Sequence, residues 1–237
     1  SQLFDNEQFS DMRVVFPKSN TVLHLHKNII CKASDFFEAC LRNQMKESID
    51  GCVVTLDDDD DEELMTAILK SYYFVEMGVL QDRMKIVPAI QLATKYQFND
   101  LLPNLTEYLL ENIDVETNIF QCLDLVLQDY GDISERVKEK LCNELQRSST
   151  RILEGESYLN LSVEQWRKTV ELMVNRDNRL LVYDAIYTWV CHDAENRTVH
   201  YPELLPLAKN AKFSVPLNPF SDFGGLGGFG CASAPTN

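Results

Sequence analysis

The sequence lacks any hydrophobic run of the ~20 residues needed to cross a bilayer. Its opening residues, SQLFDNEQFSDM, show neither the basic start nor the apolar stretch of a signal peptide. Positive charge is also scarce, because 22 Lys and Arg face 37 Asp and Glu, and the formal net charge is −15. A chain this acidic, without a basic cluster, is not expected to bind a nucleic-acid backbone. These absences predict an intracellular protein of the cytoplasm or nucleus, with no membrane or nucleic-acid partner.

Metal-ligand patterns are equally scarce. The seven cysteines are odd in number and scattered, with no C-x-x-C pair, which favours reduced thiols over a disulfide framework. His24 and His26 share one face of an expected strand, but two imidazoles are not a metal site, and we expect ordinary hydrogen-bonded histidines. The acidic run at residues 57–63 lacks the alternating ligands and glycine of a calcium loop. We expect it to favour the start of the next helix, with the remaining carboxylates solvated.

Catalytic motifs are missing as well. The sequence has no G-x-S-x-G elbow, no H-E-x-x-H and no phosphate-binding loop. A literal G-x-G-x-x-G spans Gly225 to Gly230, but no strand pattern precedes it and no helix pattern follows it. We therefore predict a protein that is not an enzyme, with no catalytic residues, cofactor or metal.

The first third of the chain mixes strand and helix signals. Apolar residues alternate on both sides of the turn sequence PKSN, which predicts a β-hairpin over residues 12–25. A third strand is expected at residues 52–56. Between them Ser34 can cap a helix whose Phe36 and Phe37 begin an apolar face.

From Glu62 onward, apolar residues recur at helical spacing. We expect helices on these sets: Leu64, Ile68, Leu69 and Tyr72; Ile86, Ile90, Ala93 and Tyr96, starting near Pro88; Leu101, Leu102, Leu105 and Leu109; Ile119, Cys122, Leu123, Val126 and Tyr130, stopped by Gly131; Ile133, Val137, Leu141 and Leu145; Val163, Trp166, Val170 and Met173; and Val182, Ala185, Ile186, Trp189 and Val190. Residues 147–157 are expected to be a loop.

These patterns predict an α+β unit over residues 1–112, an all-helical unit over 113–213 and a tail over 214–237. The tail is rich in Gly, Pro and Ser, so we expect a flexible segment. It is either a linker or a peptide that binds a partner through Phe220, Phe223 and Phe229. The linker interpretation is the simpler of the two.

Over residues 3–112 the α+β unit resembles a BTB/POZ domain, a small sheet flanked by helices. The resemblance rests on these segments, in this order: FSDMRVVF, HLHKNIICKASDFFEACL, MKES, VVTL, ILKSYYF and AIQLATKYQFNDLL. His26, Lys27, Ser34 and Phe37 fill positions of the family pattern, whereas Leu25 replaces a usual small residue. Each motif is weak alone, but their order and spacing are specific.

The helical unit resembles a BACK domain. The similarity lies in residues 158–205, and residues 113–150 correspond to the helical pair called the 3-box in adaptor proteins. The matching positions are Trp189, Val190, Arg197, Leu204 and Leu205. Together the two resemblances cover most of the chain.

The resemblance implies a non-catalytic adaptor that binds the cullin-3 scaffold and links a substrate protein to a ubiquitin ligase. Cullin-binding BTB proteins carry a hydrophobic-x-Glu triplet after the helix with the aromatic pair, and Met45 and Glu47 satisfy that pattern. Methionine is a flexible apolar knob, and the carboxylate adds a directional hydrogen bond. Tyr73 lies where the family offers an aromatic side chain to the same partner. The alternatives are that Glu47 caps the next segment and that Tyr73 packs under its helix.

The resemblance also implies a homodimer, with Leu3, Phe4 and Phe9 as candidate interface residues. Dimeric adaptors carry an extra helix before the F-S-D strand, and here only eight residues precede Phe9. The alternative function is a self-association scaffold or transcription-associated regulator that binds no cullin. No recognition repeat follows the helical unit, so the sequence does not identify the substrate.

Overall fold

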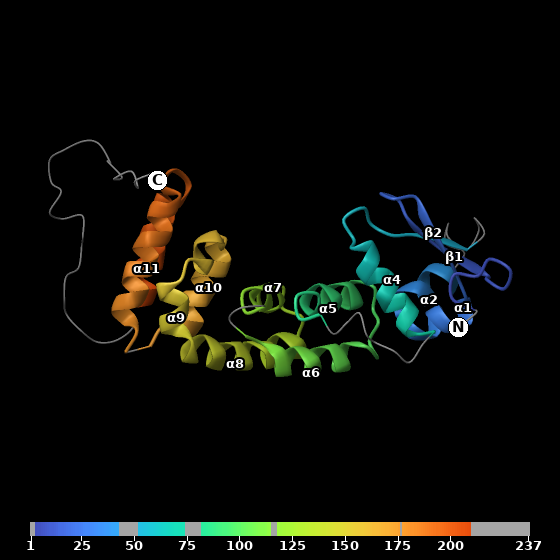
Figure 1. The fold of residues 1–237 in the computed structure, drawn as a ribbon, viewed down its shortest axis with the longest axis horizontal. Coiled ribbons are helices and arrows are strands. Elements are labelled where there is room, and N and C mark those ends of the chain that lie inside the picture. Colours follow the sequence, from blue (N-terminus) through green and yellow to red (C-terminus); the bar gives the residue numbers. More distant parts are fainter. Residues whose placement is uncertain (1–2, 43–51, 74–81, 115–117, 176, 210–237) are drawn as a thin grey trace. The chain divides into compact units, whose positions relative to one another are not determined.

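The computed structural model describes residues 3–42, 52–73, 82–114, 118–175 and 177–209. The chain divides into two compact units, Ser1–Leu141 and Cys142–Asn237. The first contains a three-stranded sheet and helices, and the described part of the second contains helices and short 3-10 turns. An α+β unit followed by an all-helical unit confirms the predicted fold class (Figure 1).

The sheet has the order β2-β1-β3. β1 (Met12–Phe16) pairs antiparallel with β2 (Thr21–Leu25), and β3 (Val53–Thr55) pairs parallel with β1. Alternate β1 residues are buried, as expected for a sheet with one face on a core. The predicted hairpin and third strand are both confirmed.

Two short helices follow the hairpin. α1 (Lys27–Ala33) was not expected from the sequence, because KNIICKA is too short to show a clear helical period. α2 (Asp35–Arg42) begins as predicted at Ser34, whose Oγ accepts a hydrogen bond from the backbone N–H of Phe37 at 3.2 Å. Ser34 Oγ also donates to the Tyr96 carbonyl at 2.5 Å, which ties the start of α2 to the end of a later helix.

The helices that follow bury most of the apolar residues that predicted them. They are α4 (Glu62–Ser71), α5 (Ile86–Lys95), α6 (Leu102–Asn112), α7 (Gln121–Leu127) and α8 (Asp132–Arg147), of which α8 begins in the first unit and ends in the second. One boundary was predicted wrongly. α7 ends at Leu127, so Gly131 does not stop it. Gly131 instead has φ +63° in the turn that begins α8, a conformation that favours glycine.

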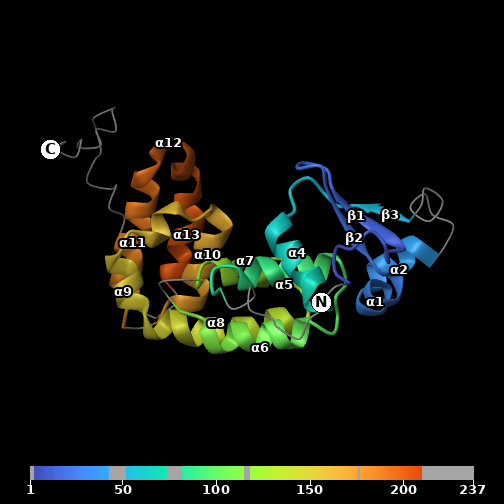
Figure 2. The ribbon, with the colours of Figure 1, turned by 45° about the vertical axis from the view of Figure 1, so that its right-hand side comes forward.

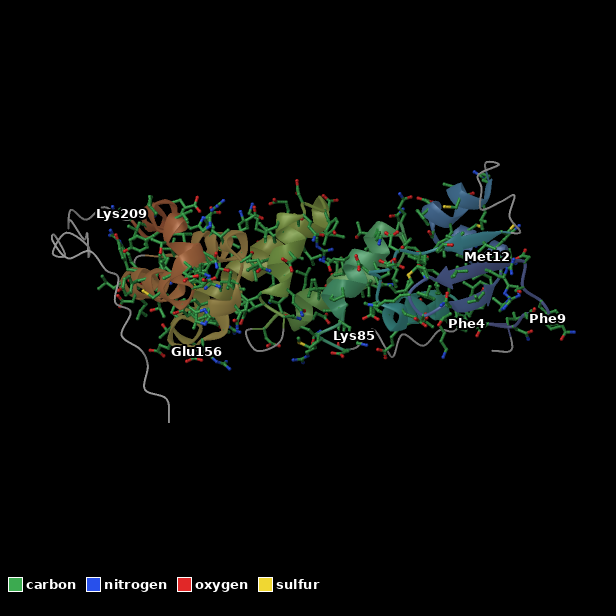
Figure 3. All side chains as sticks on the ribbon, turned by 90° about the horizontal axis from the view of Figure 1, so that it is seen from above. Phe4, Phe9, Met12, Lys85, Glu156 and Lys209 are labelled. Atoms are coloured by element: carbon green, nitrogen blue, oxygen red, sulfur yellow. The ribbon has the colours of Figure 1, made fainter. Side chains whose placement is uncertain are left out.

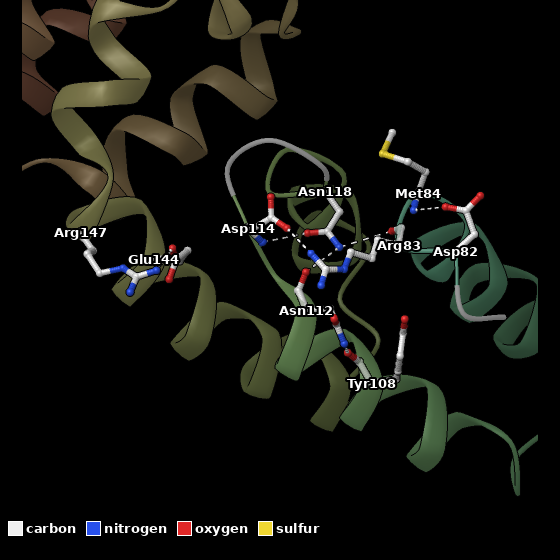
Figure 4. Close-up of polar contacts among 9 residues, drawn as sticks. All are labelled: Asp82, Arg83, Met84, Tyr108, Asn112, Asp114, Asn118, Glu144 and Arg147. Carbon is white, nitrogen blue, oxygen red and sulfur yellow. Dashed lines mark hydrogen bonds and ion pairs between the residues drawn. The ribbon is translucent and has the colours of Figure 1, made fainter.

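The buried Asn118 joins three segments of the first unit (Figure 4). Its Nδ2 donates to the carbonyls of Asn112 at 3.2 Å and Arg83 at 3.4 Å, and its Oδ1 accepts from the Asp114 N–H at 3.2 Å. Arg83 also forms an ion pair with Asp114 at 3.4 Å. The chain after α6 is thereby fastened to the segment before α5. This network helps to keep the chain after α6 within the first compact unit.

The second unit contains one helix where a loop was expected. α9 (Ser149–Glu154) buries Ile152 and Leu153 within RSSTRILEGES. The prediction of a loop was wrong because the polar flanks of this single-turn segment outweigh its two apolar residues in a sequence window. The other elements are η2 (Ser157–Asn160), α10 (Val163–Met173), α11 (Arg179–His192), α12 (Ala194–Arg197), η3 (Thr198–His200) and α13 (Tyr201–Ala208).

Two tryptophans form the centre of the second unit. Trp166 of α10 is buried and stacks on Tyr158, with 4.9 Å between ring centroids. Trp189 of α11 is also buried, and its Nε1 donates to the Leu161 carbonyl at 3.2 Å. The guanidinium of Arg197 lies 4.3 Å from the Trp189 ring centroid. The predicted apolar stripe of α11 is therefore core.

None of the helices in the described part of the chain is long and apolar enough to span a membrane. The six cysteines that the structure describes are all free thiols, in agreement with the expectation from their spacing.

Candidate protein-interaction site

Asp11, the last residue of the F-S-D motif, caps a helix to which it is not adjacent in sequence. Its Oδ1 accepts a hydrogen bond from the Lys27 N–H, the first residue of α1, at 2.7 Å. His26, at the N-cap position itself, makes no side-chain cap hydrogen bond. Because the first N–H groups of a helix have no partner within it, Asp11 supplies what His26 does not. This role of Asp11 was not predicted from the sequence, because its partner lies 16 residues away.

Tyr73, the candidate partner-binding aromatic residue, accepts a hydrogen bond from the neighbouring backbone N–H, that of His26. Its hydroxyl oxygen accepts from the His26 N–H at 2.8 Å and lies 3.3 Å from His26 Nδ1. Burial raises the pKa of the Tyr73 hydroxyl, and the hydrogen bond from the His26 backbone partly offsets that rise. The side chain is half-buried, so part of it still faces solvent. A partner that met Tyr73 here would meet its ring, because its hydroxyl is engaged within the protein.

The N-terminal segment lies beside this tyrosine. The rings of Phe4 and Tyr73 form a T-shaped pair, with 5.3 Å between centroids and 77° between planes. Asp5 Oδ1 accepts from the His24 N–H of β2 at 3.0 Å, which fastens the segment along the outer edge of the sheet. The structure thus brings together Phe4, proposed for the dimer, and Tyr73, proposed for the scaffold.

The other two candidate dimer residues are exposed. Leu3 has 44% of its surface accessible and Phe9 has 59%. Phe9 projects away from the ribbon near the start of β1 (Figure 3). Exposed apolar side chains close to a sheet edge are compatible with self-association. Their role in a dimer stays a prediction.

The scaffold-binding triplet itself falls outside the described residues, and so do Phe220, Phe223 and Phe229 of the tail. The described helix before the triplet, α2, ends at Arg42, which pairs with Glu38 at 2.8 Å. Met45 and Glu47 therefore follow the end of that helix by three and five positions. Their assignment stays a prediction.

The two histidines do not form a metal site. His24 Nδ1 lies 3.5 Å from Ser10 Oγ, and His26 lies beyond the end of β2, beside Tyr73. No group of three potential metal ligands occurs among the residues that the structure describes.

The acidic run at residues 57–63 makes more contacts within the fold than the sequence suggested. Asp61 caps α4 as expected, accepting from the Leu64 N–H at 3.0 Å. Asp60, however, has a side chain only 5% exposed, accepts from the Tyr96 hydroxyl, and pairs with Lys95 Nζ at 2.6 Å. The expectation that the remaining carboxylates are solvated is therefore wrong for Asp60. Sequence windows could not reveal this because Tyr96 lies far along the chain.

These contacts shift two pKa values. Burial and the hydrogen bond to Asp60 raise the pKa of Tyr96 to about 12. Burial alone would lower the pKa of Lys95, but its hydrogen bonds to Asp57 and Asp60 raise it overall. These shifts keep Lys95 in its charged form and Tyr96 in its neutral form near neutral pH.

Residues 1–113, which contain the sheet and both caps, match the family described as BTB/POZ domain. The expected resemblance over residues 3–112 is thus confirmed.

Several known proteins are similar to this chain over a longer stretch than residues 1–113. The Kelch-like protein 25 of Rattus norvegicus is 24% identical over 185 residues, which cover 76% of this chain and 30% of the relative. The human Kelch-like protein 25 is 26% identical over 187 residues, with the same coverage. The human Kelch repeat and BTB domain-containing protein 3 is 22% identical over 200 residues, 83% of this chain and 31% of the relative. The chain thus spans less than a third of the length of these relatives.

Proposed function

We propose that this protein is a non-catalytic adaptor that binds a cullin-3-type scaffold through its BTB/POZ domain and links a substrate protein to a ubiquitin ligase. In this proposal residues 113–213 are a BACK domain, with its 3-box at 113–150, and extend the scaffold contact. The Kelch-like relatives support a BTB adaptor. The substrate is not specified by this chain.

One observation carries the proposal: the M-K-E triplet begins three positions after the end of α2, and α2 has the cap and the aromatic pair expected of the scaffold-binding helix. Phe37 is buried against Phe98, with 6.0 Å between ring centroids, and Ser34 fixes the start of the helix. Because α2 is held by these contacts and ends at Arg42, the position from which the chain continues toward the triplet is defined. Met45 would supply apolar contact area and Glu47 a charge-assisted hydrogen bond.

Tyr73 contributes its ring in this proposal. Tyr73→Phe would keep the ring and lose the acceptor for the His26 N–H, at a cost of about 1 kcal/mol in folding free energy. Scaffold affinity per folded molecule should be unchanged in that variant. A Tyr73→Phe variant that is fully folded yet binds tenfold or more weakly, about 1.4 kcal/mol, would show that the hydroxyl serves the partner instead.

The proposed adaptor is a homodimer through its N-terminal segment. Leu3 and Phe9 are exposed and apolar, and the contact between Phe4 and Tyr73 places this segment beside the proposed scaffold surface. Sedimentation velocity of the wild type and of the Leu3→Ser, Phe9→Ser variant tests this part. Dissociation of a dimer in the variant is expected, and a monomeric wild type would contradict it.

The scaffold proposal is tested by titration calorimetry of the full chain with the N-terminal domain of cullin-3. The wild type should bind with nanomolar to micromolar affinity. Met45→Ala, Glu47→Ala should lose at least about 2 kcal/mol, roughly thirtyfold in affinity, because interface energy concentrates in a few side chains.

The matched control variant replaces one exposed methionine and one exposed glutamate that lie away from the triplet. Met84 is 48% exposed and Glu111 is exposed near the end of α6, so Met84→Ala, Glu111→Ala should bind as the wild type does. Equal losses in the two variants would contradict a docking role for the triplet. A wild type that gives no heat and no complex would favour the self-association scaffold.

A further inference from the structure

Helix α11 is apolar on two sides. Its inner stripe is buried around Trp189, yet its outer side carries Leu180 with 70% of its surface exposed and Tyr187 with 45% exposed. Leu181 beside them is 37% exposed. Leu180 and Tyr187 are seven residues apart, so they lie on one helix face, ~10 Å apart along the axis. Apolar side chains on both sides of a helix are typical of a helix covered on both sides.

The chain leaves the helical unit close to this outer face. Arg179, the first residue of α11, donates from Nε to the carbonyl of Ala208, the last residue of α13, at 2.8 Å. Figure 2 shows α11 and α13 side by side. The last described residues of the chain, Ala208 and Lys209, therefore lie close to the start of α11, where Leu180 is.

The sequence that follows has a matching pattern. Phe213, Val215 and Leu217 alternate with small or polar residues, so an extended segment would present all three on one side. Five residues of extended chain reach ~17 Å, enough to carry Phe213 from Ala208 onto the face. An extended segment 213–217 is ~13 Å long, close to the separation of Leu180 and Tyr187. This segment lies outside the described residues.

The charges near the segment and near the start of α11 are also of opposite sign. Lys209 and Lys212 precede the segment in sequence, and two exposed carboxylates lie near the start of α11, Asp177 just before the helix and Asp184 in its second turn. Because the segment is joined directly to α13, its effective concentration at this face is of order millimolar, so even weak contacts fill the site. We propose that residues 213–217 bind in cis across the outer face of α11, covering Leu180 and Tyr187. The proposal is independent of any scaffold binding.

Hydroxyl-radical footprinting of the full chain tests the proposal, because it measures the accessibility of individual side chains. Three chains are compared: the wild type, a Phe213→Ser, Val215→Ser, Leu217→Ser variant, and a control Phe220→Ser, Phe223→Ser, Phe229→Ser variant. Val199 is the internal reference, because it is also 70% exposed and lies beyond the opposite end of α11.

Leu180 and Tyr187 should be labelled about threefold more slowly in the wild type and in the distal control than in the 213–217 variant, in proportion to the surface covered. Val199 should be labelled equally in all three. Equal labelling of Leu180 in the wild type and the 213–217 variant would overturn the proposal. Protection that grows with protein concentration would also overturn it, by showing that a second copy covers the face.

Discussion

Ser34 offers a sharp test of how the first unit is held together. Its side chain is 1% exposed and makes two hydrogen bonds, one from the Phe37 N–H at 3.2 Å and one to the Tyr96 carbonyl at 2.5 Å. Ser34→Ala removes a helix N-cap, worth ~1 kcal/mol, and leaves a buried carbonyl without this donor, worth another ~1–3 kcal/mol. We expect a total loss of about 2–4 kcal/mol in the free energy of unfolding.

Urea denaturation measures this loss. With a slope of about 2 kcal/mol per molar, the midpoint of the first unit should fall by about 1–2 M. Tryptophan fluorescence reports only the second unit, because Trp166 and Trp189 are the sole tryptophans. Hydrogen exchange of α2 and α5 therefore reads the first unit directly.

A matched serine gives the control. Ser71 Oγ donates to the Ile68 carbonyl at 2.6 Å near the end of α4, and it caps nothing and connects no distant element. Ser71→Ala should therefore cost less than about 1 kcal/mol. If Ser34→Ala shifts the midpoint no more than Ser71→Ala does, then the two hydrogen bonds of Ser34 do not hold α2 to the end of α5, and the reasoning fails.

Three further perturbations test other parts of the fold. Arg197→Lys should lower the stability of the second unit by about 2 kcal/mol, because lysine lacks the planar guanidinium that stacks on Trp189 and donates to two backbone carbonyls. Thermal unfolding followed by tryptophan fluorescence measures this loss, and a loss below about 0.5 kcal/mol would contradict the prediction. Because burial and the hydrogen bond to Asp60 raise the pKa of Tyr96 to about 12, its stabilising contribution is complete below the unfolded pKa of about 10 and is lost as the pH rises toward 12. As the pH rises from about 9 to 11, the stability of the Tyr96→Phe variant should therefore fall less than that of the wild type. Identical pH profiles of the urea midpoint for the two proteins would contradict the raised pKa of Tyr96. Gly131→Ala should cost about 1 kcal/mol because φ is +63° with open space around the Cβ position, and Gly131→Asn should cost less; equal denaturation midpoints for both variants would contradict backbone strain as the cause.

Elements with strong periodicity were predictable. Val163–Met173 was expected from its apolar spacing and begins after Ser162, whose side chain forms a capping box with Gln165. The hairpin was equally clear, because its apolar alternation changes phase across a polar turn. In both cases the signal lies within one short window of sequence.

The parts that could not be predicted depend on contacts between distant residues. α1 begins where Asp11 and Tyr73 supply acceptors, from positions 16 and 47 residues away. Asp60 is buried because Tyr96 and Lys95, on α5, reach it. No local pattern contains these partners, so a window that sees only aspartates predicts a solvated run.

The same contacts separate residues that build the BTB/POZ domain from residues that are free to recognise a partner. Asp11 and the Tyr73 hydroxyl each satisfy an N–H at the start of α1, so their presence is accounted for by the fold. A similar sequence would need them whether or not it binds a cullin, and they therefore do not distinguish an adaptor from a self-association scaffold. Leu3 and Phe9 are exposed, and exposed apolar side chains add nothing to the core. The distinction between the two functions thus rests on the residues that follow α2, Met45 and Glu47, which is why the calorimetric comparison of that pair decides it.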